Sequence, residues 1–180
     1  PLFLAGVRIF PAGIMILGAT LLRGESSPIS WKGWAWIGLF ALVDGLMFQG
    51  FLGEGLMRTG AGLGSVMIDS QPLAVAVMSR WLFKEVIGIW GWLGLLVGII
   101  GIGLIGLPDE WIIRWWQGDF SRIIDWHWQT LFSNGQWLML LASLSMAGGT
   151  VMIPFISRHV DAVVATGWHL VLGGLVLFLL

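Results

Sequence analysis

Long apolar runs alternate with short polar segments along the whole chain. A helix needs about 20 mostly apolar residues to cross the hydrocarbon of a bilayer. Six runs meet this length: residues 1–22, 34–53, 60–83, 88–107, 136–156 and 162–180. A lone strand cannot satisfy its backbone in lipid, and the alternation of a barrel strand is missing. The pattern therefore predicts an all-α fold, a polytopic membrane bundle with six transmembrane helices.

The charged residues between these runs indicate how the helices cross the membrane. If each run crosses once, every segment with an excess of basic residues falls on one side. These basic residues are Arg23, Lys32, Arg80, Lys84, Arg158 and His159. By the positive-inside rule that side is cytoplasmic. The opposite side holds Glu54, Arg58 and a long loop with mixed charges.

Composition supports the bilayer as the solvent for this chain. Hydrophobic residues make up 57% and charged residues 11%, with a mean hydropathy of +0.90. A soluble domain carries about 25% charged residues. A net charge of −1 without a basic block gives no footprint for nucleic acid. Cysteine is absent and tryptophan occurs 13 times without any tyrosine, so tryptophan must form any aromatic belt at the membrane surface.

Residues 108–135 form a loop too long for a plain connector. Apolar residues recur there near helical spacing with charges between them: Trp111, Ile112, Trp115, Phe120, Ile123 and Ile124. This pattern is typical of a helix lying in the membrane interface. An anchored loop without a further role is the favoured interpretation, and a gate or lid is the alternative.

A short internal repeat relates the first apolar run to the last. Residues 6–13 fall on residues 167–174, so that Gly6 matches Gly167, Arg8 matches His169 and Ala12 matches Gly173. The two copies lie five spans apart and therefore cross the membrane in opposite directions. Inverted repeats of this kind are common in transporters, with the solute site between the two halves near the midplane.

Ionisable residues inside the apolar runs are the candidate site. A charge at a helix centre costs about 2.5–3.5 kcal/mol on insertion scales, so such residues are rare and usually face a path or a partner. The candidates are Arg8, Asp44, Asp69 and His169, with Gln49, Gln71 and Trp168 beside them. Each also has a structural explanation. Asp44 could be neutral and bonded to a neighbouring backbone, and Arg8 could snorkel or pair with Asp44 or Asp69 in a packing contact.

Two runs carry stripes of small residues. In the third run, small and polar residues recur at helical spacing: Arg58, Gly62, Ser65, Asp69, Pro72, Ala76 and Ser79. A stripe of this kind can line a wet cavity, and Pro72 removes one backbone hydrogen bond and can act as a hinge. In the fourth run, Gly94 and Gly98 form a GxxxG pair that predicts helix packing. That packing could lie within the chain or between protomers, so the oligomeric state stays open.

Enzyme motifs are missing from the sequence. His127, His159 and His169 have no metal-ligand spacing, and no nucleophile elbow, Walker A loop or dinucleotide fingerprint occurs. We expect no cofactor and no metal.

With these residues in view, the chain resembles the EamA-like permeases of the drug/metabolite transporter superfamily. Arg8 with Ala12-Gly13 is similar to the basic residue and small pair of the family's second helix, and His169 with Gly173-Gly174 to its counterpart in the second half. Segment 62–72, the ending Phe83-Lys84-Glu85 and the glycine-rich run from Trp92 follow in the family's order. The resemblance implies helices two to seven of ten. We expect a first repeat lacking its first helix at 1–107, an interfacial segment at 108–135 and a truncated second repeat at 136–180.

The resemblance implies a permease of the bacterial plasma membrane that exports or exchanges a small organic metabolite. Its partners would be the lipid bilayer, a small-molecule solute and protons as coupling ion. A membrane scaffold or partner subunit without a solute path is the second hypothesis, and it predicts that Asp44, Asp69 and Arg8 form a closed packing cluster. A lipid-modifying enzyme is the third, although the sequence offers no metal or phosphate cluster for it.

Overall fold

The computed structural model describes residues 1–24, 28–106, 116–117 and 134–180. Within these ranges the chain is helical and holds no strand. The elements are α1 (Leu2–Leu22), α2 (Trp31–Phe40), η1 (Ala41–Phe48), α3 (Gln49–Arg58), α4 (Ala61–Ile68), α5 (Gln71–Phe83), α6 (Ile89–Gly106), α9 (Gly135–Ile156) and α10 (Ala162–Leu179). The predicted interfacial segment lies almost wholly outside the described residues, so the structure does not test it.

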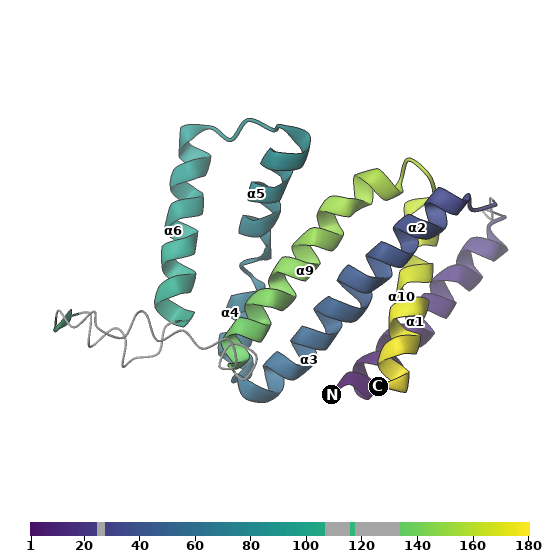
Figure 1. The fold of residues 1–180 in the computed structure, drawn as a ribbon, viewed down its shortest axis with the longest axis horizontal. Helices are drawn as coiled ribbons and strands as arrows, with labels where there is room; N and C mark the ends of the chain where they lie inside the picture. Colours follow the sequence, from purple (N-terminus) through teal and green to yellow (C-terminus); the bar gives the residue numbers. More distant parts are fainter. Residues whose placement is uncertain (25–27, 107–115, 118–133) are drawn as a thin grey trace.

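The all-helical membrane fold is confirmed. Five helices among the described residues are long and apolar enough to cross a membrane, and the apolar α6 is a sixth candidate with a shorter qualifying stretch. Successive candidate spans, with α2, η1 and α3 as one span and α4 and α5 as another, run in alternate directions (Figure 1), as the charge pattern predicts. The end of α5 that carries Arg80 therefore lies on the side away from Arg58, as does the last turn of α9, which Arg158 follows by two residues.

The second span is longer than predicted. α2, η1 and α3 form one continuous helix of 28 residues from Trp31 to Arg58. The Ser30 side chain caps its start by accepting a hydrogen bond from the Gly33 N–H. At its other end Arg58 pairs with Glu54 one turn earlier, at 2.9 Å. Polar interactions at both ends thus extend the helix past its apolar segment.

The third span is broken in its middle. α4 ends at Ile68 and α5 begins at Gln71, with Asp69 and Ser70 between them. Pro72 lies in the first turn of α5, where its missing N–H costs little. The Ser70 hydroxyl donates to the Met67 carbonyl oxygen at 2.6 Å and so satisfies part of the α4 terminus. The proline therefore starts a second helix rather than kinking a continuous one.

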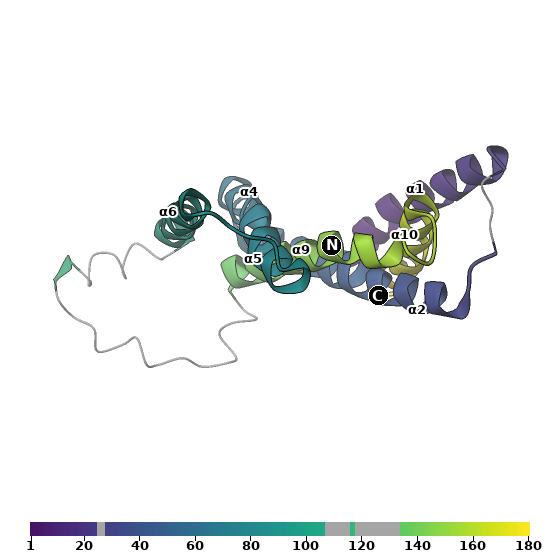
Figure 2. The ribbon, with the colours of Figure 1, turned by 90° about the horizontal axis from the view of Figure 1, so that it is seen from above.

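α9 is the central helix of the bundle. It contacts α4 and α5 on one side and η1 and α3 on the other. Figure 2 shows α4 and α6 toward one end of the molecule and α1 at the opposite end. α6 is largely exposed along its length. Most of the helices that hold candidate site residues therefore contact α9, and α1 packs on α10 and α3.

α1 and α10 pack antiparallel through four glycines. A Cβ at Gly6 would lie 2.9 Å from the Gly174 carbonyl oxygen, and one at Gly13 would lie 2.8 Å from the Gly167 carbonyl oxygen. The repeat found in the sequence equates Gly6 with Gly167 and Gly13 with Gly174. Exchanging equivalent residues turns one of these contacts into the other. The helix pair thus has the contact pattern that a local two-fold axis between equivalent helices produces.

Candidate functional site

Asp44 and His169 form a pair inside the bundle. Asp44 Oδ2 lies 3.2 Å from His169 Nε2, within hydrogen-bond distance. His169 is 3% exposed, whereas the Asp44 side chain is 22% exposed. Both residues lie within long apolar helices, where an isolated charge is unfavourable. The pairing therefore gives each polar group a partner and leaves part of the carboxylate accessible.

Two glycines allow close packing of η1 and α10 (Ala162–Leu179), the helices that carry Asp44 and His169. A Cβ at Gly173 would lie 2.7 Å from Gly45 Cα, and a Cβ at Gly45 would lie 3.1 Å from the His169 carbonyl oxygen. Gly45 follows Asp44, and Gly173 lies one helical turn after His169. The backbones of η1 and α10 approach closely only because neither position carries a side chain, and this brings the carboxylate within reach of the imidazole.

A π-helical segment carries Asp44. Residues Ala41–Phe48 adopt the wider π-helix between two α-helical segments. A π-helical stretch rotates the following residues relative to an α-helix, and such stretches occur frequently at functional sites. Asp44 lies in the first half of this segment, so its direction depends on a local departure from regular helix that the hydrophobic pattern does not encode.

The pair is enclosed by an aromatic ring on one side and a glycine on the other. The Phe40 ring lies 4.0 Å from the His169 ring, centroid to centroid. A Cβ at Gly149 of α9 would lie 2.6 Å from Asp44 Oδ1, so the carboxylate occupies the space left by the missing side chain. His169 Nδ1 is buried and has no hydrogen-bond partner among the described residues. The carboxylate is thus held in the space beside Gly149, and one imidazole nitrogen is buried without a hydrogen-bond partner among the described residues.

A second polar contact lies on the neighbouring face of α9. Gln71 Nε2 donates to Thr150 Oγ1 at 3.0 Å, and the Ser70 and Ser143 hydroxyls are 2.8 Å apart. Thr150 directly follows Gly149, which contacts Asp44. The Gln71–Thr150 bond therefore lies at the level of the Asp44–His169 pair, and the Ser70–Ser143 contact lies about 9 Å away along α9.

Two further predicted residues make separate contacts. The Arg8 guanidinium donates to Gln49 Oε1 at 3.3 Å. The Trp168 ring packs edge-on against Trp34 at 4.9 Å between centroids. Arg8 is bound to an amide rather than to a carboxylate, so the polar residues of the spans do not all gather in one cluster.

The structure does not bring Asp69 to Asp44. The Asp69 side chain is exposed at the break between α4 and α5, as is Pro72. On α6, a Cβ at Gly98 would lie 3.0 Å from the Leu73 side chain, while Gly94 has open space around it. Of the predicted GxxxG pair, one glycine therefore contacts another helix of the described chain.

Sequence reasoning missed the contribution of α9. Gly149 and Thr150 contact the candidate residues Asp44 and Gln71, and Ser143 bonds Ser70 beside them, although none of these three α9 residues was singled out. The available signal was the spacing of Ser143 and Thr150, seven residues apart and thus on one helix face within an apolar run. Phe40 gave no signal because an aromatic residue in a membrane helix is ordinary. Within the described ranges, three or more potential metal ligands do not gather anywhere.

Comparison with known proteins agrees with this architecture. A family model described as the EamA-like transporter family matches residues 1–107. The chain is 62% identical over 97% of its length to "Uncharacterized transporter sll0355" of Synechocystis sp., of which it spans 53%. It is 46% identical over 97% of its length to "WAT1-related protein At3g02690, chloroplastic" of Arabidopsis thaliana, of which it spans 39%.

A more distant relative, "Uncharacterized transporter YoaV" of Bacillus subtilis, is 23% identical over 98% of the chain, which spans 56% of that protein. The chain thus spans about half the length, or less, of these curated relatives. No solved structure matches it. The family match covers more than half of the chain and agrees with the apolar helices, so this is a multi-pass membrane protein that belongs to the EamA-like transporter family.

Proposed function

We propose that this chain forms part of a secondary transporter that moves a small organic solute by alternating access, with Asp44 and His169 on the solute path. The observation that carries the proposal is the partly buried contact between Asp44 Oδ2 and His169 Nε2 at 3.2 Å. A carboxylate and an imidazole at bilayer depth are favourable where polar helices enclose water or a solute. The partial exposure of Asp44 leaves an oxygen for such a partner.

The antiparallel packing of α1 and α10 supports an inverted repeat as the framework. α1 and α10 contact each other through equivalent glycines in a two-fold pattern. Transporters built from inverted repeats hold their solutes where the halves meet. In this account residues 1–107 belong to the first half, residues 136–180 begin the second, and His169 and Arg8 occupy equivalent positions that contact anionic groups of the solute or a carboxylate.

Gln71 and Thr150 form a second part of the wall of the proposed path. Their contact lies beside the break between α4 and α5, where backbone carbonyls lose their helical partners. Broken membrane helices commonly place such groups against a solute. Asp69 at the same break, together with Asp44, Gln49 and Trp168, completes the set of residues that we assign to the path. Gly94 and Gly98 would serve helix packing, and Pro72 would serve as a hinge.

The solute that we propose is a small organic metabolite, such as an amino acid or a drug-like compound, which is exported or exchanged. Protons are the proposed coupling ion, through His169 or Asp69, because imidazole and carboxyl groups exchange protons in polar membrane sites. The plasma membrane of a bacterium is the proposed location. The relatives from Synechocystis sp. and Bacillus subtilis support a bacterial source, whereas the plant relative is named as chloroplastic.

The proposal is tested by solute flux in vesicles that contain the full-length protein, after a metabolite export screen has identified a solute. Asp44→Asn should lower flux at least about tenfold, because it removes a charge that acts on the solute or the proton. Asp161→Asn is the matched control. Asp161 caps α10 by accepting from the Val163 and Val164 N–H groups, and asparagine retains that cap.

Asp69→Asn is measured in parallel to locate the path along the broken span. Unchanged flux and unchanged pH dependence in both Asp44→Asn and Asp69→Asn would remove the proposed site. That outcome would favour a membrane scaffold in which the polar residues serve packing alone.

A further inference from the structure

Phe155 near the end of α9 lies between two other aromatic rings. Its ring is 5.8 Å from Trp36 of α2, with 11° between the planes, and 5.4 Å from Phe83 of α5, with 20° between the planes. We call Trp36, Phe83 and Phe155 the Phe155 stack. All three rings are half-buried. The stack therefore connects α2 and α5 through a single side chain of the helix that runs between them.

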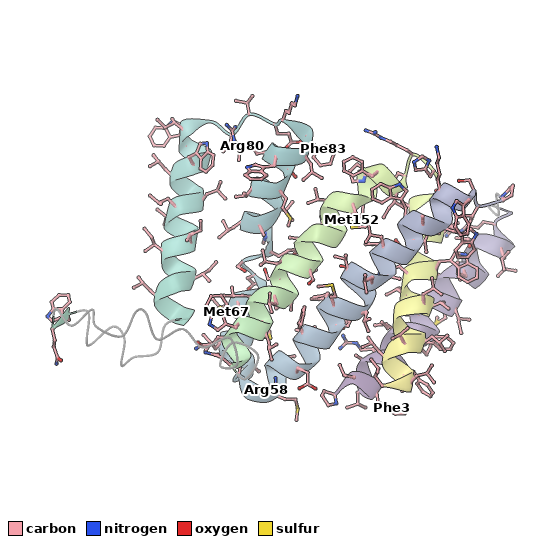
Figure 3. All side chains as sticks on the ribbon, in the orientation of Figure 1. Phe3, Arg58, Met67, Arg80, Phe83 and Met152 are labelled. Carbon is pink, nitrogen blue, oxygen red and sulfur yellow. The ribbon has the colours of Figure 1, made fainter. Side chains whose placement is uncertain are left out.

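The Phe155 stack lies at the end of the bundle that carries basic residues. The Arg158 guanidinium lies over the Phe155 ring at 5.4 Å from the ring centre. Arg80 and Phe83 are close together at the end of α5, on the side away from Arg58 (Figure 3). The stack is thus one of the last side-chain layers between the middle of the bundle and this surface.

The stack lies beyond the polar site along α9. Gly149, which contacts Asp44, precedes Phe155 by six residues, or about 9 Å at the helical rise of 1.5 Å per residue. On the proposed path, a solute that leaves Asp44 on the side of Arg158 passes the level of the Phe155 stack.

A proline separates the stack from the polar site. Pro154 lies inside α9 and has no N–H to donate to the carbonyl oxygen of Thr150, four residues earlier. The Thr150 hydroxyl accepts from Gln71 and donates to the Met146 carbonyl oxygen at 2.9 Å, which ties this turn to the polar site. α9 is therefore weakest between the turn that faces the site and the turn that carries Phe155.

We propose that the Phe155 stack is a gate that closes the solute path on the side of Arg158, and that the end of α9 swings about Pro154 to open it. This inference rests on the proposed transport function. When α9 bends, Phe155 leaves Trp36 and Phe83, and the polar site opens to that side. Restored stacking closes it again, with the Arg158 side chain over the ring.

Sided labelling of a cysteine tests the gate without measuring transport. The chain contains no cysteine, so Thr150→Cys, in full-length protein freed of other thiols, gives one reporter at the polar site. A membrane-impermeant thiol reagent is added on the side of Arg158. The parent should react slowly, and Phe155→Ala should react at least about tenfold faster, because two ring contacts are lost. Phe155→Leu retains an apolar side chain and should show the same direction if the alanine variant does not fold.

Two controls separate gating from a general loss of packing. Phe3→Ala removes an equal ring that contacts Phe178 at 4.9 Å, at the other end of the molecule, and should leave labelling unchanged. Pro154→Ala should slow labelling below the parent rate, because it restores the missing helical hydrogen bond. Equal labelling of the parent and both Phe155 variants would overturn the gate, even if the protein is found to transport a solute. Gated labelling in a protein that moves no solute would instead contradict the proposed transport function.

Discussion

Asp44 Oδ2 and His169 Nε2 lie 3.2 Å apart although the two residues are 125 positions apart in the chain. The contact joins the second span to the last one and places a carboxylate and an imidazole inside apolar helices. The close approach of Gly45 and Gly173 makes it geometrically feasible. The polar site is therefore a consequence of backbone packing as much as of the two polar residues.

Substitution of Gly149 should disturb the pair through packing alone. A Cβ there would lie 2.6 Å from Asp44 Oδ1 and 2.8 Å from Asp44 Cβ, so Gly149→Ala should lower the free energy of unfolding by about 1–3 kcal/mol. Gly148→Ala is the neighbouring control, since its Cβ would meet only a Val43 methyl at 3.3 Å. Thermal unfolding in detergent compares the two variants. Equal stability would show that Asp44 does not occupy the space beside Gly149.

Glycines of α1 should differ sharply in their tolerance of alanine. At Gly13 a Cβ would lie 2.8 Å from the Gly167 carbonyl oxygen, whereas at Gly18 no atom lies within 4 Å. Gly13→Ala should therefore destabilise the α1–α10 pair, while Gly18→Ala should be neutral or stabilising by up to about 1 kcal/mol. The same unfolding measurement decides between them. A tolerated alanine at Gly13 would contradict the two-fold glycine contact.

The hydrogen bond between Gln71 and Thr150 should appear as a coupling energy. In a double-mutant cycle with Gln71→Met and Thr150→Val, we expect about 0.6 kcal/mol and at most about 1.7 kcal/mol, the range for hydrogen bonds between membrane helices. Ser65→Ala combined with Thr150→Val is the control, because the Ser65 hydroxyl bonds the Gly62 carbonyl oxygen of its own helix. Additive effects in both cycles would mean that α5 and α9 do not interact through this bond.

The hydrophobic pattern predicts the bounds of most helices, because a helix must be long and apolar enough to cross the lipid. α1, α6, α9 and α10 begin and end within two residues of their predicted bounds. The second span is extended by the Ser30 cap and the Glu54–Arg58 pair, which a hydrophobicity pattern does not register. The break at Asp69 and Ser70 was missed for a related reason. Proline at the start of a helix and proline inside one give the same sequence signal.

Prediction of the site was limited by long-range packing. Asp44 and His169 were identified as polar residues at bilayer depth, but their pairing depends on which helices are neighbours. The repeat did equate Gly6 with Gly167, and these positions lie in the α1–α10 contact. The π-helix at Ala41–Phe48 has no signature in residue type. The direction of the Asp44 side chain could therefore not be derived from helical spacing.

The central claim, that Asp44 faces a wetted path, is tested most directly by the reactivity of Asp44→Cys with a small charged thiol reagent in vesicles of the full-length protein. Such reagents attack thiolates in water and not thiols in lipid. Leu42→Cys, two residues away on the same helix and 48% exposed, is the control for a side chain facing lipid. The account predicts that the cysteine at position 44 reacts, that the transported solute slows the reaction, and that the cysteine at position 42 stays unlabelled. An unreactive cysteine at position 44 would contradict it.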